Sequence, residues 1–217
     1  MSYSRDERRA LCALLNEKGP KAPTLCEGWA TLDLAAHLVL RERRPDAGAG
    51  MLGGPLARYT THVQNRLAER VPYQRLVEMV RNGPPKLSVF GLPGVDDRAN
   101  LVEYFVHHED VRRGEPGWAP RDLDPAFAEQ LWRRLGMTRF ILRKAPVGIE
   151  FARDDLDGGD GDSQHRMSVK TGTPVVTVVG HPSELVMWAL GRTGAAQVRL
   201  DGADQALAAL NKTHWRL

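Results

Sequence analysis

Two side chains four residues apart, Glu103 and His107, are the residues of this sequence whose types and spacing most clearly suggest chemistry. On an α-helix, residues at this spacing lie one above the other on the same face, so both can reach one ion. His37, in a separate segment with helical spacing, offers a third ligand. Two imidazole nitrogens and one carboxylate oxygen with an open position are typical of a catalytic metal site. The sequence therefore predicts a metalloenzyme.

The alternative is that these side chains have ordinary structural roles. Acidic residues and a histidine opposite an apolar stripe often form only the solvated face of a helix. A single histidine is more often a hydrogen-bonded core residue than a ligand. Two features favour ligation here: Tyr104 and Val111 make the flank of the Glu103 helix apolar, and His37 lies among leucines, where an imidazole needs a polar partner.

The neighbours of this group have different expected roles. Asp110, three residues after His107, is placed to support a ligand or to bind substrate. His108 points about 100° away from His107 and is expected at the surface or behind a ligand. Of the two cysteines, Cys12 is expected in the core. Cys26 is close enough in sequence to the His37 helix to approach the site but is interpreted as an inert structural thiol.

Hydrophobic spacing predicts an all-helical N-terminal part followed by a small α+β part. A Thr at position 31 is the expected cap of the second helix. Helices are expected at residues 4–17, 31–44, 56–69, 73–81, 98–113 and 124–144. After Pro146, segments 147–154, 165–170, 174–180 and 197–202 have the texture of strands, with helices at 182–190 and 203–210. The predicted domains are residues 1–145, an antiparallel helical bundle, and residues 146–217, an α+β domain.

Segments 26–38 and 103–112 resemble the N-terminal domain of the mycothiol-dependent maleylpyruvate isomerase family. That family belongs to the DinB-like metal-binding four-helix bundles. The residues that carry the resemblance are Gly28, Trp29, Asp33, Leu34, His37, Glu103, His107 and Asp110. The segment SELVMWALGR followed by VRLDG is similar to the small sterol-carrier-like α+β domain that many members append.

The resemblance implies His37, Glu103 and His107 as metal ligands and the actinobacterial thiol mycothiol as cofactor. It implies an isomerase or an S-transferase acting on a small electrophile through a metal-bound thiolate, and the ligand set does not separate the two. Zinc is the expected ion, with nickel, manganese or iron as alternatives. Asp110 and Arg192 are candidate catalytic residues. Arg112 and Arg192 are candidates for binding an anionic substrate or the thiol, with a surface role as the alternative.

Composition excludes other classes. The net charge is only +3, and no patch combines basic and aromatic residues, so no nucleic-acid partner is expected. No apolar run reaches the length of a membrane span, and the N-terminus is charged, so a cytoplasmic monomer or homodimer without membrane association is expected. The competing functional class is a non-enzymatic metal-binding protein with a structural ion and a partner-binding C-terminal domain.

Overall fold

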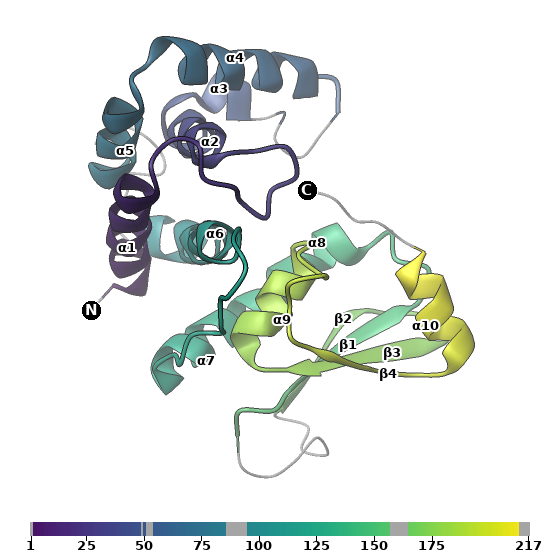
Figure 1. The fold of residues 1–217 in the computed structure, drawn as a ribbon. Helices are drawn as coiled ribbons and strands as arrows, with labels where there is room; N and C mark the ends of the chain where they lie inside the picture. The colour runs from purple at the N-terminus through teal and green to yellow at the C-terminus, as the bar shows by residue number, and fades with distance from the viewer. Residues whose placement is uncertain (1, 49, 51–53, 86–94, 157–164, 213–217) are drawn as a thin grey trace. The chain divides into compact units, whose positions relative to one another are not determined.

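The computed structural model shows a mixed α/β protein that is mostly helical and contains a four-stranded sheet (Figure 1). It describes residues 2–48, 50, 54–85, 95–156 and 165–212. The chain divides into two compact units, Met1–Pro120 and Arg121–Leu217, and each is described by itself. None of the helices within the described residues combines the length and the apolar character needed to cross a membrane.

The first unit is helical. Its helices are α1 (Tyr3–Lys18), α2 (Thr31–Arg43), α3 (Pro45–Gly48), α4 (Ala57–Arg70), α5 (Tyr73–Arg81) and α6 (Val95–Arg112). The expected helices are confirmed, and α3 was not foreseen. The cap of α2 differs from the prediction, because Thr31 is the first helical residue and Ala30 precedes it. The carboxylate of Asp33 accepts a hydrogen bond from the backbone N–H of Ala30 at 2.9 Å, which satisfies one of the exposed amides at this helix end.

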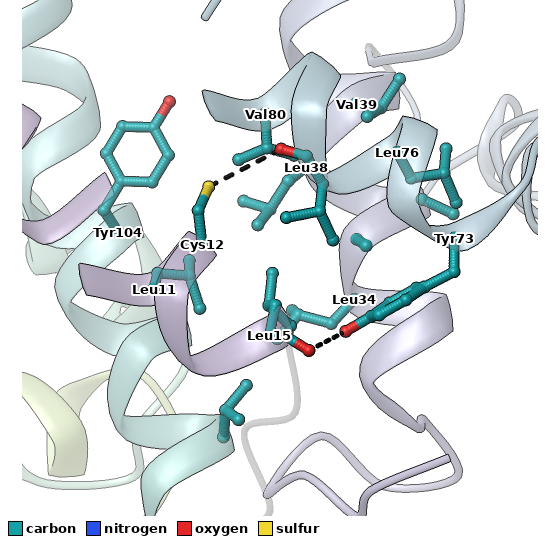
Figure 2. Packing of buried hydrophobic residues seen from close by; sticks show 14 residues of the cluster. Leu11, Cys12, Leu15, Leu34, Leu38, Val39, Tyr73, Leu76, Val80 and Tyr104 are labelled. Carbon is teal, nitrogen blue, oxygen red and sulfur yellow. Dashed lines mark hydrogen bonds between the residues drawn. The ribbon is translucent and has the colours of Figure 1, made fainter. Parts of the chain in front are cut away.

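An apolar core joins α1, α2, α5 and α6 (Figure 2). Its buried members are Leu11, Cys12, Leu15, Leu34, Ala35, Ala36, Leu38, Val39, Tyr73, Leu76, Val77, Val80, Tyr104 and Val111. Polar atoms in this core are satisfied locally: the Tyr73 hydroxyl donates to the carbonyl of Leu15 at 2.7 Å. Cys12 is a buried core residue, as expected. Burial of the apolar faces of α2 and α6 in this core fixes the rotation of each helix about its own axis.

The second unit combines helices with the sheet. Its elements are α7 (Pro125–Arg134), a 3-10 turn (Leu135–Thr138), α8 (Arg139–Leu142), β1 (Gly148–Arg153), β2 (Arg166–Lys170), β3 (Val175–Gly180), α9 (Pro182–Ala189), β4 (Arg199–Asp201) and α10 (Asp204–Asn211). The strand order is β2-β1-β3-β4, with β1 parallel to β3 and the outer pairs antiparallel. Helices α9 and α10 pack against the sheet, where the Phe151 and Trp188 rings meet edge to face at 6.0 Å. The expected change to strand periodicity after Pro146 is confirmed.

Two details at the junction differ from the prediction. The division lies between Pro120 and Arg121, earlier than the expected boundary at 145. The helix expected over residues 124–144 is broken into α7, a 3-10 turn and α8. The reason lies in packing: α7 lies against α9, and its Glu129 pairs with Arg153 of β1 at 2.5 Å. These contacts make α7 part of the second unit, although its own sequence reads as one more amphipathic helix.

The core assignment leads to a stability prediction. Leu76 is fully buried in the first unit, whereas Leu56 is 47% exposed. Leu76→Ala should lower the free energy of unfolding by about 2–5 kcal/mol through lost burial and the cavity left behind. Leu56→Ala should change it by no more than about 0.5 kcal/mol. Urea denaturation of both variants tests this, and equal effects would contradict the assignment of the core.

Candidate metal centre

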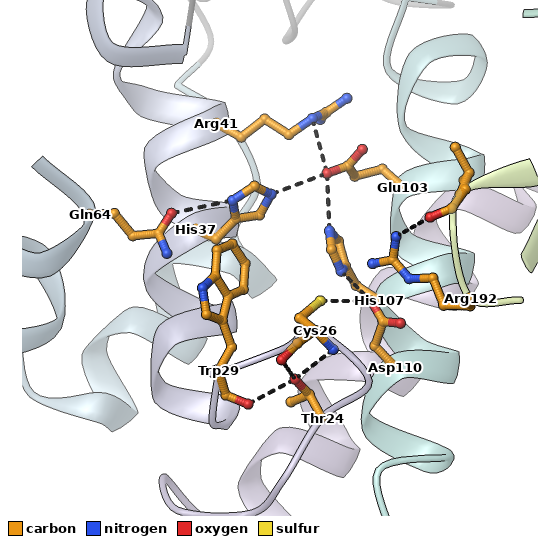
Figure 3. A network of polar contacts seen from close by, with 11 residues as sticks. Thr24, Cys26, Trp29, His37, Arg41, Gln64, Glu103, His107, Asp110 and Arg192 are labelled. Carbon is orange, nitrogen blue, oxygen red and sulfur yellow. Dashed lines mark hydrogen bonds and ion pairs between the residues drawn. The ribbon is translucent and has the colours of Figure 1, made fainter. Parts of the chain in front are cut away.

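Three side chains from α2 and α6 converge on one point in the first unit (Figure 3). The Nε2 atom of His107 lies 3.2 Å from Oε1 of Glu103, and the Nε2 atom of His37 lies 3.5 Å from the same oxygen. One ligand atom from each residue lies within 4.8 Å of the others. The two imidazole rings meet nearly edge to face, with centroids 5.2 Å apart. The sequence spacing therefore translates into a cluster that could surround a single ion.

The other nitrogen of each imidazole is held by a polar side chain. Nδ1 of His107 lies 2.9 Å from Oδ2 of Asp110, a fully buried carboxylate one helical turn further along α6. Nδ1 of His37 lies 3.4 Å from Oε1 of Gln64, on α4. Metal-ligating histidines usually have this arrangement, because a hydrogen bond at one nitrogen fixes the ring and aims the other nitrogen at the ion.

The charges of the cluster follow from its contacts. Burial lowers the pKa of His107, but its hydrogen bonds with Asp110, Cys26 and Glu103 outweigh burial and hold that pKa well above its ordinary value. Burial raises the pKa of Glu103, but hydrogen bonds with both histidines and the charge of Arg41 outweigh it and hold that pKa well below its usual range. For His37, burial and the charge of His107 lower the pKa. The group thus holds an imidazolium, a carboxylate and a neutral imidazole.

A short loop before α2 brings a thiol to the same place. Sγ of Cys26 lies 3.2 Å from Oδ2 of Asp110. Within the loop, the Thr24 hydroxyl donates a hydrogen bond to the carbonyl of Trp29 at 2.9 Å. The loop is attached to α6 because the backbone N–H of Leu25 donates to the carbonyl of Asp110 at 3.0 Å. The Trp29 ring lies 5.0 Å from the ring of His37. Cys26 was expected to be able to approach the site, and it does so, although the sequence did not identify Asp110 as its partner; its inertness stays a prediction.

Two further residues at the cluster were not foreseen. Arg41 lies one helical turn after His37, and its Nε is 3.4 Å from Oε1 of Glu103. The available signal was the four-residue spacing from His37, which places Arg41 on the same face of α2. Gln64 had no comparable signal, because its helix approaches α2 only through tertiary packing.

The remaining candidates have partners of their own. His108 is buried, and its Nδ1 lies 2.9 Å from Oε2 of Glu7 on α1, so it contacts α1 inside the first unit and is not at the surface. Arg112 is held by Glu109 at 2.9 Å and donates to the carbonyl of Ala119 at 3.2 Å. Arg192 belongs to the second unit, where its Nη1 donates to the carbonyl of Leu190 at 2.6 Å. The roles predicted for these two arginines stay predictions.

Comparisons with protein-family models, with characterised proteins and with solved structures found no match to this chain. The argument about function therefore depends on the cluster itself.

The cluster predicts how stability depends on pH in the metal-free protein. Because the pKa of Glu103 is lowered from 4.5, its contribution to folding is complete above about pH 4.5 and is lost as the pH falls further. Because the pKa of His107 is raised above 6.5, the contribution of His107 to folding is complete below about pH 6.5. It is lost as the pH rises through the raised pKa. Glu103→Gln should therefore be most destabilising between these limits.

The expected loss is about 1.4 kcal/mol for each unit by which the folded-state pKa is shifted. Urea denaturation with a chelator, repeated from about pH 3 to pH 9, measures the difference between wild type and variant. The difference should shrink at both ends. An exposed control, Glu69→Gln, should change the free energy of unfolding by no more than about 0.5 kcal/mol at any pH. A pH-independent effect of Glu103→Gln would contradict the charge assignment.

The thiol-bearing loop provides a second prediction. A Cβ added at Gly114, just after α6, would collide with the backbone carbonyl of Pro23, whose carbon would be 2.7 Å away. Gly114→Ala should therefore push the loop off α6 and lower the free energy of unfolding by about 1–3 kcal/mol. Gly194→Ala has open space around the added atom and is the matched control. Thermal unfolding tests both, and a neutral Gly114→Ala would show that the loop is not clamped there.

Proposed function

We propose that the chain is a divalent-metal-dependent, thiol-dependent enzyme similar to the mycothiol-dependent maleylpyruvate isomerases. It would act in the cytoplasm on a small electrophile by isomerisation or S-transfer. The observation that supports this most directly is the approach of two imidazole Nε2 atoms to the same oxygen of Glu103, at 3.2 and 3.5 Å. Two nitrogens and one carboxylate oxygen leave room in a zinc coordination sphere for an exogenous ligand.

The residues fit a divalent ion for a second reason. The proton on Nε2 of the His107 imidazolium faces Oε1 of Glu103, and an ion bound between these two atoms would replace that proton. Asp110 would keep the ring in place by accepting the Nδ1 proton, and Gln64 would do the same for His37. The donor set favours zinc, with nickel, manganese or iron as alternatives.

The ion would lower the pKa of a bound thiol, so that the thiolate persists at neutral pH. The chain's own residues would do the rest. Arg41, beside Glu103, adds positive charge at the cluster and favours anions there. Trp29 lies against His37 and limits the access of water to that side of the ligand. Asp110 would act through His107 as a positioning residue, and the catalytic role expected for it from the resemblance stays a prediction.

The same proposal covers the fold. The long helices α1, α2, α4 and α6 would correspond to a DinB-like four-helix bundle. The sheet of the second unit, with α9 and α10, would correspond to the sterol-carrier-like domain. The order of helices and strands is compatible with both assignments. Arg192, at the end of α9, would then bind the anionic substrate or the thiol.

The test compares two adjacent histidines. His107→Ala removes one of three protein ligands and should lower metal affinity by more than the 10–100-fold typical of losing a residue that only orients a ligand. Turnover with mycothiol and maleylpyruvate should be lost with the metal. The helix should survive, since alanine is the best helix former and the apolar face of α6 is untouched.

His108→Ala is the matched control. It should keep the metal and the turnover but lower the free energy of unfolding by about 1–3 kcal/mol, because the buried hydrogen bond between the His108 ring and Glu7 is lost. Metal analysis, circular dichroism and turnover measure the three effects. Retained metal in His107→Ala would show that the wrong histidine was assigned. Metal binding without thiol-dependent turnover in the wild type would favour the alternative, a structural ion in a non-enzymatic protein.

A further inference from the structure

A second group of possible ligands lies on the opposite side of the His107 ring. It consists of Sγ of Cys26, Oδ2 of Asp110 and Nδ1 of His107, and one ligand atom of each lies within 4.8 Å of the others (Figure 3). The thiol and the imidazole both approach the same carboxylate oxygen, at 3.2 and 2.9 Å. The group shares the His107 ring with the cluster at Glu103 but uses the other nitrogen, because that cluster uses Nε2; an ion here would replace the Nδ1 proton that Asp110 otherwise accepts.

We propose that Cys26, His107 and Asp110 form a second cation site, which takes a thiophilic divalent ion such as zinc, cobalt or cadmium. One sulfur, one nitrogen and one oxygen donor are a ligand set that borderline and soft ions prefer over magnesium or calcium. The site does not require thiol chemistry, a substrate or an ion at Glu103. It therefore goes beyond the proposed function.

The separations fit such an ion. With bonds of about 2.3 Å to sulfur and about 2.0 Å to nitrogen or oxygen, a tetrahedral site has ligand–ligand edges of roughly 3.3–3.5 Å. The observed contacts to Asp110 are 2.9 and 3.2 Å. Small outward movements of the ligands would admit the ion. Binding would release two protons, one from the Cys26 thiol and one from Nδ1 of His107, and both ligands would bind through the lone pairs so exposed.

The backbone holds the donors in place before any ion arrives. Asp110 and His107 are one turn apart on α6, and the backbone hydrogen bond from Leu25 to Asp110 ties the residue before Cys26 to the same turn. Thr24 also accepts the backbone N–H of Cys26 at 3.2 Å. The sulfur is therefore carried by a loop attached to the helix that supplies the other two ligands, which lowers the entropic cost of assembling them.

The sulfur is identifiable because the sequence has only two cysteines. Cys12 is completely buried in the apolar core, and burial raises the pKa of its thiol to about 11. At neutral pH it has neither the thiolate nor the access that metal binding needs. A thiolate-to-metal signal from this protein would therefore report Cys26.

The experiment is a titration of the metal-free full chain with Co²⁺ alone, followed by absorption spectroscopy. The wild type should develop a near-ultraviolet thiolate-to-cobalt charge-transfer band. Cys26→Ser should lose this band entirely, whereas Cys12→Ser should retain it. His37→Ala should retain it as well, because His37 belongs only to the cluster at Glu103. Circular dichroism shows that each variant is folded.

Each other result has a defined meaning. A wild type without the charge-transfer band, or a band that survives Cys26→Ser, overturns the second site. A band lost in folded His37→Ala also overturns it, because Cys26 would then be a further ligand of the cluster at Glu103. The visible ligand-field bands of cobalt arise from an ion at either site, so they report the cluster at Glu103 alone only where the thiolate band is absent. Their persistence in Cys26→Ser and loss in His37→Ala would support the proposed metal centre even if the second site failed.

Discussion

The two-sided hydrogen bonding of His107 is the interaction on which the candidate site depends. Its Nε2 faces Glu103 four residues earlier, and its Nδ1 faces Asp110 three residues later. Both carboxylates are on the same helix as the ring, so their positions are set by helical geometry and not by loop conformation. A nearly buried imidazolium is costly unless both nitrogens are paired, and α6 supplies both partners. The direction of Nε2 is therefore set by residues of α6 alone.

The rest of the first unit brings partners to this fixed nitrogen. Packing in the apolar core orients α2 so that His37 faces α6. Helix α4 packs against α2, and its Gln64 reaches the other nitrogen of the His37 ring. The loop before α2 adds Cys26 through its attachment to the Asp110 turn. A ligand set built across two helices in this way needs correct packing of the whole unit. The Glu103–His107 pair alone would form in any stable version of α6.

This difference explains what could be predicted from the sequence. The relative positions of Glu103, His107 and Asp110 follow from spacing on one helix, as does the direction of His108, and the observed contacts agree with them. The roles of these residues at a metal stay predictions. His37 was inferred because an imidazole in an apolar stripe needs a partner, which is a weaker but still local argument. Arg41 was missed although it lies four residues after His37 on the same helix, and Gln64 was missed because its contact with His37 is tertiary. The domain boundary was misplaced for the same reason, since the amphipathic pattern of α7 does not say which apolar surface it covers.

The balance of charge at the cluster connects its geometry with the proposed chemistry. In the metal-free state, the positive charges of His107 and Arg41 offset the negative charges of Glu103 and Asp110. Exchange of the His107 Nε2 proton for a divalent ion would leave one excess positive charge in a largely buried setting. One anionic ligand restores neutrality, whereas a neutral ligand does not. Because uncompensated charge is costly away from water, these residues would favour an anionic ligand, such as the proposed thiolate, over a neutral thiol or water molecule at the open position. Arg41 is decisive in this balance, since without it the ion and the two carboxylates would already be neutral.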